Sequence, residues 1–348
     1  MEKVKYGIIG TGYNCKAHIA NLNVIEEVEI AAISGRNEEN LAKAAQWVKK
    51  KRPKTFTDYH RLLKEDLDVV IISTPNYTHK KITIESLEMG KNVLCEKPMA
   101  TTIEDCDVMI STAEKSGKLL QIGLELRSCD YFRKIKEVVE KGNIDQVHYI
   151  WWKEFRGPFQ PGRGGWRFTN LTGGTLLEKN VHHFDMFNWI TGSKAIKVSA
   201  FGGKNVYKEY EGIDNAMVII EYENGVRANL NVCLFSPWQS KSGSHQEIGI
   251  IGEKGKLEGY PDINRIYLFD QEGTAITYKI GESARMSAYG KLSDYDKWFP
   301  LLYNEHLALI KSIKENKEPV VTGEIGKEAV RLALAAQEAI KTGRVIPV

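Results

Sequence analysis

Three ionisable side chains fall in one column of a predicted helix near the middle of the chain. Glu178, His182 and Asp185 are spaced i, i+4 and i+7, so they share one helix face. Another stripe of the same helix is formed by Leu177, Val181, Phe184 and Asn188. An imidazole titrates near neutrality and can accept a hydroxyl proton, and a neighbouring carboxylate can orient the ring and favour its protonated form. A solvated helix face is the alternative. Because His182 and His183 are adjacent and point apart, we do not expect a metal site.

A lysine earlier in the chain could complement this imidazole. Lys97 follows a strand predicted at residues 92–96, within the tripeptide Glu96-Lys97-Pro98. Beside a bound nicotinamide its ammonium could polarise a substrate oxygen, and we also expect Glu96 and Lys97 to contact the cofactor. Taken alone, the tripeptide could equally be a surface loop. The sequence leaves open a cis bond on either side of Lys97.

The first strand and turn of the chain suit a dinucleotide. An apolar run at residues 6–9 is typical of a buried parallel strand and leads through Gly10-x-Gly12 into a helix. The glycines would permit a sharp turn and a close approach to a pyrophosphate, which the helix amides would face. Cys15 takes the third glycine position and weakens the motif, so an ordinary tight turn is the alternative. The expected cofactor contacts are Gly10, Thr11, Gly12, Tyr13 and Asn14.

The end of the second predicted strand, residues 28–33, bears on the choice of cofactor. NAD sites usually place an acid there, but this chain has Ser34, Gly35 and Arg36. An arginine beside small residues suits a 2′-phosphate, so we favour NADP over NAD. Alternatively, Arg36 caps the loop, or stacks on adenine and accepts both cofactors.

A third strand end offers further contacts. The buried strand predicted at residues 68–73 leads into Thr74, Pro75 and Asn76, which could lie along the nicotinamide or its ribose. His79 could contact the cofactor, or could be a helix-capping or packing residue.

Alternation of strands and helices up to residue 122 predicts an α/β fold with a parallel, doubly wound sheet. After Gly123 the pattern becomes strand-rich, and turns at residues 223–225 and 271–273 fit antiparallel hairpins. Two helices, at 298–315 and 324–342, close the chain. We therefore expect a cofactor domain at 1–123 and a substrate and oligomerisation domain at 124–348. Strands of the second domain are predicted at 147–155, 196–202, 216–222, 226–235, 246–251, 256–260, 265–269 and 274–280.

Length and composition agree with two domains. A chain of 348 residues is too long for a typical single core. The net charge of +3 argues against nucleic acid or an anionic membrane as a partner. No apolar stretch is long enough to span a membrane, and no signal peptide is evident. Five cysteines without Cys-x-x-Cys spacing indicate reduced thiols, so we expect a cytoplasmic protein.

In combination these motifs resemble the Gfo/Idh/MocA family of oxidoreductases. The resemblance covers nearly the whole chain and implies a Rossmann domain, a second α/β domain with a large, mostly antiparallel open sheet, a site between them, and a homodimer or homotetramer. It places the family's catalytic lysine on Lys97, its Asp-x-x-x-His pair on Glu178 and His182, and a further acid on Asp185. Glu178 replaces the common Asp, and Asn180 a frequent Gly. The matching stretches are Gly-Ile-Ile-Gly-Thr-Gly at 7–12, Thr-Pro-Asn-x-x-His at 74–79, Glu-Lys-Pro at 96–98 and Gly-Gly…Glu-x-x-x-His-x-x-Asp at 173–185.

The expected function is that of an NAD(P)-dependent dehydrogenase acting on a sugar, cyclitol or sugar derivative, similar to inositol dehydrogenases. His182 would take the proton of a carbinol, and Lys97 would stabilise the alkoxide while hydride passes to the nicotinamide. The alternatives are an NAD-dependent glycosidase and a non-catalytic dinucleotide-sensing regulator. A glycine-rich stretch at 157–165 could form a loop over the substrate, and arginines there could bind sugar hydroxyls or an acidic substituent. The alternative is that these arginines are scattered over the surface. The expected substrate contacts are Arg127, Arg163, Trp166, Arg167 and His183.

Overall fold

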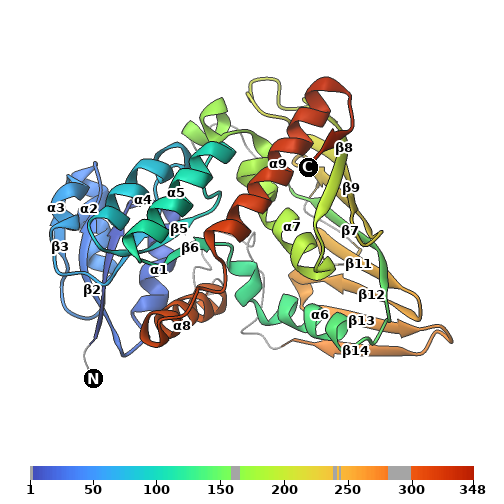
Figure 1. Cartoon of the computed structure of the whole chain (residues 1–348), viewed down its shortest axis with the longest axis horizontal. Coiled ribbons are helices and arrows are strands. Elements are labelled where there is room, and N and C mark those ends of the chain that lie inside the picture. Colours follow the sequence, from blue (N-terminus) through green and yellow to red (C-terminus); the bar gives the residue numbers. More distant parts are fainter. Residues whose placement is uncertain (1–2, 158–164, 238–240, 243, 281–298) are drawn as a thin grey trace. The chain divides into compact units, whose positions relative to one another are not determined.

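The chain forms two units, each built on its own sheet (Figure 1). The computed structural model describes residues 3–157, 165–237, 241–242, 244–280 and 299–348. The first unit comprises Met1–Ser128 and Trp298–Lys327, and the second comprises Cys129–Lys297 and Glu328–Val348.

The sheet of the first unit has six parallel strands in the order β3-β2-β1-β4-β5-β6. The order reverses between β1 and β4, where open α/β sheets bind their ligands. The apolar runs of the central strands are buried on both faces, as a parallel sheet requires. This confirms the predicted doubly wound sheet. The strands are β1 Val4–Ile9, β2 Val28–Ser34, β3 Lys54–Phe56, β4 Val69–Ile72, β5 Asn92–Glu96 and β6 Leu120–Gly123.

Several helices of the first unit begin or end at recognisable capping residues. Asn37 accepts a hydrogen bond from the Asn40 amide at the start of α2, and Thr102 accepts one from Asp105 at the start of α5. Gly117 ends α5 in the left-handed conformation. The helices are α1 Tyr13–Leu22, α2 Glu38–Trp47, α3 Tyr59–Leu63, α4 His79–Glu88, α5 Ile103–Ser116 and α8 Phe299–Glu315, with short 3-10 turns η1 Asn76–Thr78 and η2 Glu125–Ser128.

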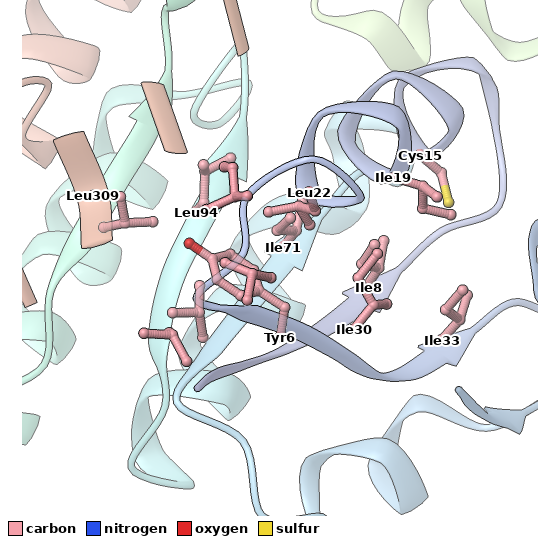
Figure 2. Packing of buried hydrophobic residues seen from close by; sticks show 14 of the residues in the cluster. Tyr6, Ile8, Cys15, Ile19, Leu22, Ile30, Ile33, Ile71, Leu94 and Leu309 are labelled. Carbon is pink, nitrogen blue, oxygen red and sulfur yellow. The ribbon is translucent and has the colours of Figure 1, made fainter. Parts of the chain in front are cut away.

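Helix α8 joins the first unit although it comes from the far end of the chain. Its Leu309 and Ile310 are buried in the cluster that contains Tyr6, Leu22 and Leu94 (Figure 2). The sequence placed this helix in the second domain, because an amphipathic pattern does not reveal which sheet the helix will cover. The domain boundary near residue 123 stays a prediction.

The second unit has a nine-stranded sheet in the order β14-β13-β12-β11-β7-β10-β9-β8-β15. Every neighbouring pair is antiparallel except β7 and β10, which run parallel. The predicted large, mostly antiparallel sheet is therefore confirmed. The strands are β7 Val147–Phe155, β8 Ala195–Gly203, β9 Asn215–Tyr222, β10 Arg227–Cys233, β11 Gln246–Gly252, β12 Gly255–Tyr260, β13 Arg265–Asp270, β14 Ala275–Lys279 and β15 Ile346–Pro347.

One face of this sheet is covered by α6 Asp130–Glu140, α7 Thr175–Thr191 and the part of α9 Gly323–Thr342 that belongs to this unit (Figure 1). Trp152 of β7 is fully buried there, with its ring 5.2 Å from Phe132 and 6.2 Å from Phe187. The unit also contains the 3-10 turns η3 Gly165–Phe168, η4 Asn170–Thr172 and η5 Pro261–Ile263. Across the described ranges, no helix is both long and apolar enough to cross a membrane.

Candidate functional site

The turn between β1 and α1 is shaped for a phosphate group. Gly10 has a φ of 110°, and a Cβ atom there would lie 2.5 Å from the carbonyl oxygen of Ser73, so only glycine fits. A Cβ on Gly12, in contrast, would meet no atom within 4 Å. Gly12 offers no side-chain cap to α1, and the first turn of this helix holds no acidic residue. This arrangement fits a pyrophosphate at the helix N-terminus.

The end of β2 packs against this turn. Ser34 is buried, and a Cβ on Gly35 would lie 2.5 Å from the side chain of Thr11, so glycine is needed for the close approach. Arg36 is exposed and makes no ion pair within the described part of the chain. Its guanidinium is therefore available to an anion.

His79 ties two strand ends together inside the first unit. The ring is buried, with Nδ1 2.8 Å from the carbonyl oxygen of Pro98 and Nε2 2.9 Å from that of Thr74. Burial lowers the pKa of His79 despite these two carbonyls, so the ring is neutral and donates to one of them at a time. These contacts favour the packing alternative for His79. Pro75 and Asn76 follow Thr74 at the same edge of the sheet.

Lys97 lies where β5 ends, and its bond to Pro98 is cis. Its neighbour Glu96 is buried, with Oε1 2.8 Å from Nε2 of His18. Burial alone would raise the pKa of Glu96. The His18 hydrogen bond, together with the charges of His18, Lys97 and His79, outweighs burial and lowers the pKa. The sequence analysis missed His18, which occupies an ordinary interior position of α1.

The acid–base column lies on α7 in the second unit. Glu178 and Asp185 are only 4% and 1% exposed, so the column is not a solvated face, and His182 is half-buried. Glu178 is held by two cations, Lys179 Nζ at 2.9 Å and Arg167 Nε at 3.6 Å. Leu177, Val181 and Phe184 of the predicted apolar stripe are buried, and packing covers most of the remaining circumference of α7 as well.

Asp185 lies two turns after Glu178 on α7 and is also buried. Burial, and after it the Asp185 charge, raises the pKa of Tyr222 on β9. The Tyr222 hydroxyl stays protonated and donates to Asn188 at 3.0 Å. The charge of Asp185 therefore lies close enough to β9 to act on Tyr222.

A buried carboxylate on β7 organises a second group of polar residues. Glu154 is fully buried and accepts hydrogen bonds from Arg156 at 2.5 Å and from Asn180 at 2.6 Å, and His183 Nε2 lies 3.6 Å away. Burial raises the pKa of Glu154, but Arg156, His183 and Asn180 outweigh it, so the pKa is lowered. The ring of His183 also lies edge-on to Trp152, with centroids 4.6 Å apart.

This group accounts for asparagine in place of the frequent glycine at position 180, because the Asn180 amide donates a hydrogen bond to Glu154. Glu154 was missed in the sequence, although a signal was there. Glu154 follows Ile150 and Trp152 at every second position of the strand, so the three side chains share its buried face. An acid on such a face needs a hydrogen-bond or ion-pair partner.

The remaining predicted substrate contacts are distributed between the two units. Arg127 is half-buried in η2 of the first unit. Trp166 and Arg167 share η3 of the second unit, with the guanidinium carbon 5.4 Å from the indole centroid. Arg163 and most of the 157–165 stretch lie outside the described residues. All these roles stay predictions.

Two family models match the chain. One, described as an oxidoreductase family with an NAD-binding Rossmann fold, matches residues 4–124, and the other, its C-terminal alpha/beta domain, matches residues 136–348. The chain belongs to the Gfo/Idh/MocA oxidoreductase family. The resemblance found in the sequence is thereby confirmed. The expectation of an NAD(P)-dependent dehydrogenase acting on CH–OH groups is also confirmed at the level of the family.

Individual relatives span the same length as this Gfo/Idh/MocA member. The myo-inositol 2-dehydrogenase of Thermotoga maritima is 28% identical over 345 residues, which are 98% of this chain and 97% of that protein. A solved probable dehydrogenase from Thermotoga maritima is 26% identical, with a TM-score of 0.81 and 99% of each chain covered. An oxidoreductase from Agrobacterium radiobacter, solved with NAD+, L-tartaric acid and magnesium, has a TM-score of 0.87 at 18% identity. The match covers 99% of this chain and 98% of that chain, and at this low identity it shows only that the two share a fold.

Proposed function

We propose that this Gfo/Idh/MocA member oxidises a CH–OH group of a cyclitol, sugar or sugar derivative with NAD(P), or reduces the matching ketone. One observation carries the proposal: β1, β4 and β5 are neighbours in a parallel sheet, so Gly12 and Lys97 share its carboxyl edge. An amine thus lies at the same edge as an open dinucleotide turn. Similarity to a myo-inositol 2-dehydrogenase makes myo-inositol the first substrate to test.

The cofactor would be held by three strand ends of the first unit. The amides after Gly12 suit the pyrophosphate, the residues around Arg36 suit the adenosine ribose, and Thr74, Pro75 and Asn76 lie further along the edge. When bound, NAD(P) supplies the hydride acceptor or donor. We favour NADP because Arg36 is exposed and no acid follows β2 directly.

The acid–base work falls to Lys97 and His182. In this proposal His182 accepts the hydroxyl proton, and the Lys97 ammonium stabilises the oxygen as negative charge develops on it. Glu178 is occupied by Arg167 and Lys179, so we assign it the role of holding these cations toward substrate hydroxyls. Asp185 is almost fully buried, and we assign it to positioning α7 rather than to contact with substrate.

The variant His182→Ala tests this assignment. Loss of a general base lowers kcat by roughly 10²–10⁴-fold at neutral pH, whereas cofactor affinity should change by less than about twofold. His148→Ala is the matched control, since His148 is an exposed histidine of the same unit, paired with Glu253. A large loss of NADP affinity in His182→Ala, or an unchanged kcat, would contradict the role.

We also infer that the chain assembles as a homodimer or homotetramer through the open face of the nine-stranded sheet. Phe201, Met217 and Ile219 on β8 and β9 are 77%, 65% and 55% exposed. Phe201 and Met217 are direct cross-strand partners, so the apolar side chains form one surface. A surface of this kind is typical of protein–protein contact.

A cytoplasmic location is the remaining part of the proposal. All five cysteines are free thiols, and all but Cys233 are buried. Unpaired cysteines are the usual state in a reducing compartment.

A further inference from the structure

A chain of three buried side chains ends one residue before Lys97 in the first unit. Nε2 of His18 on α1 lies 2.8 Å from Oε1 of Glu96, and Nδ1 of His18 lies 3.0 Å from Nε2 of His306 on α8. Both rings are fully buried, and Glu96 is 6% exposed. Three segments far apart in sequence therefore meet at the end of β5.

We propose that His18 and His306 are positioning residues for the reaction. They hold Glu96 as a carboxylate in one orientation, and Glu96 in turn fixes the position and the electrostatic setting of Lys97. This inference rests on the proposed function, because it concerns the step that Lys97 assists.

The direction of the hydrogen bonds follows from the chemistry of the three groups. A carboxylate only accepts, so the proton of His18 lies on Nε2, and Nδ1 of a neutral ring then accepts from His306. Within the described part of the chain, Nδ1 of His306 is buried and has no hydrogen-bond partner. A proton there would be an unused buried donor, so the proton of His306 lies on Nε2. Every donor in the chain points toward Glu96.

The surroundings keep His306 neutral. Burial, and after it the proximity of His18, lowers the pKa of His306 well below its usual range. A neutral ring with its single proton on Nε2 can serve only as a donor to His18, so the order of the chain does not reverse near pH 7.

Glu96 has little freedom on its other side. A Cβ atom on the neighbouring Gly123 of β6 would lie 3.2 Å from the Glu96 Cα and 3.4 Å from Oε2, so the carboxylate already fills this space. The charges that act on Glu96 come from His18, Lys97 and His79. Glu96 is thus an ionised group beside the Lys97 ammonium.

A second acid nearby does not compete with Glu96. Glu305, next to His306 on α8, is buried, and neither of its oxygens has a hydrogen-bond partner among the described residues. Burial, followed by the charges of Glu125 and Glu96, raises the pKa of Glu305 well above its usual range. The surroundings therefore favour the protonated form of Glu305, whereas the lowered pKa of Glu96 favours its carboxylate.

Loss of the histidine donors should act on Lys97 through Glu96. A buried carboxylate without a donor takes up a proton, because desolvation then decides its pKa. A neutral Glu96 no longer places a negative charge beside Lys97 and can turn away from its present orientation. The reaction step should suffer, while the phosphate-binding turn at Gly12 stays intact.

The test compares His306→Phe with His306→Gln. Phenylalanine keeps the ring volume without a donor, whereas the glutamine amide can donate from about the position of Nε2. We expect His306→Phe to lower kcat about tenfold, less than loss of an acid–base group itself, and to shift the acidic limb of the kcat–pH profile upward. His306→Gln should recover most of this loss, and the NAD(P) Kd should stay within about twofold in both.

Leu309→Ala is the matched control on the same helix. It truncates a fully buried leucine and should lower the Tm without altering the pH profile. The inference is overturned if His306→Phe keeps the parent kcat and pH profile, or if Leu309→Ala reproduces the shift of the acidic limb.

A second readout does not depend on turnover. In protein with ¹³C-labelled glutamate, the Glu96 carboxyl should titrate at a higher pH in His306→Phe and in His18→Phe than in the parent. An unchanged Glu96 titration overturns the inference. If no polyol is oxidised with either cofactor, the proposed function fails, and this titration still decides whether the histidines hold Glu96 ionised.

Discussion

At the scale of single residues, the two glycines of the first turn have different reasons to be glycine. Gly10 is required by the fold, because its φ of 110° and the closeness of Ser73 exclude a side chain. Gly12 has open space around its Cβ position, so the protein itself tolerates a larger residue there. A ligand that approaches the backbone, as proposed for the pyrophosphate, would account for the open space at Gly12.

The pair Gly10→Ala and Gly12→Ala should separate stability from binding. Gly10→Ala should destabilise the fold by about 1–3 kcal/mol, as expected for strain at a positive φ. Gly12→Ala should leave the Tm nearly unchanged and weaken NAD(P) binding about tenfold, since a methyl group would displace the pyrophosphate. Thermal unfolding and calorimetric titration measure the two effects. Parent-like cofactor affinity in Gly12→Ala would count against the phosphate site.

Arg36 decides between the two cofactors in this account. Arg36→Ala should weaken NADP by roughly 10–100-fold, the value of one or two hydrogen bonds to a charged group, and NAD much less. The dissociation constants are measured by fluorescence titration, with the exposed Arg52→Ala as control. Equal losses for both cofactors would show that Arg36 does not meet a 2′-phosphate.

The residue types at the strand ends were evident in the sequence, but their partners were not. Glycine positions follow from local backbone rules, so Gly10 and Gly12 could be assigned from their spacing after a strand. The contact of His18 with His306 joins residues 288 positions apart, and no local pattern encodes it. For the same reason the contact of His183 with Glu154 could not be predicted, whereas packing was one of the two alternatives given for His79.

At the scale of elements, α7 shows how far helical periodicity reaches. The spacing correctly placed Leu177, Val181 and Phe184 on a buried stripe. It also placed Glu178 and Asp185 on a polar face, yet both are buried, and Glu178 pairs with Arg167 and Lys179 there. An amphipathic pattern identifies the most apolar side of a helix and not everything that packs on it.

The link between α7 and β7 through Asn180 and Glu154 should be visible in the pH dependence of stability. The folded pKa of Glu154 lies below its usual value of 4.5, so its ionised form stabilises the fold above that pH. This stabilisation is lost as the pH falls through the folded pKa. Asn180→Ala removes one donor and should cost about 1–3 kcal/mol near pH 7, and less in more acidic solution.

Thermal unfolding of parent and variant at several pH values measures this difference. Asn188→Ala on the same helix is the control, because its partner is the uncharged hydroxyl of Tyr222 and its cost should not follow the Glu154 titration. A cost of Asn180→Ala that is the same at neutral and acidic pH would mean that Glu154 is not the ionised partner.

At the scale of the whole molecule, the kind of each sheet could be predicted from the sequence, but not every pairing within it. The order of strands and helices was enough to predict both sheets, since alternation indicates parallel pairing and hairpin turns indicate antiparallel pairing. The sequence could not show that β7 and β10 pair in parallel within the antiparallel sheet, or that α8 belongs to the first unit. In both cases a strand or helix packs on a partner far away in the sequence, and other strands or sheets offer a similar apolar surface.

The open apolar face of the nine-stranded sheet should control assembly. Phe201→Lys combined with Met217→Lys places two charges on cross-strand neighbours and should reduce the solution mass toward the 39.4 kDa of one chain. Light scattering coupled to size exclusion measures the mass. Val24→Lys, an exposed apolar position of the first unit, is the control. An unchanged mass in the double variant would place the interface elsewhere.

The most direct test of the central claim is a double-mutant cycle of Lys97→Ala and His182→Ala, followed by NAD(P)H absorbance with myo-inositol or the best polyol found. If the amine and the imidazole act on one carbinol, each single variant loses roughly 10²–10⁴-fold in kcat, and the double variant is little slower than the slower single. Losses that multiply in the double variant, or a single variant that turns over like the parent, would contradict the claim that these two groups share one reacting oxygen.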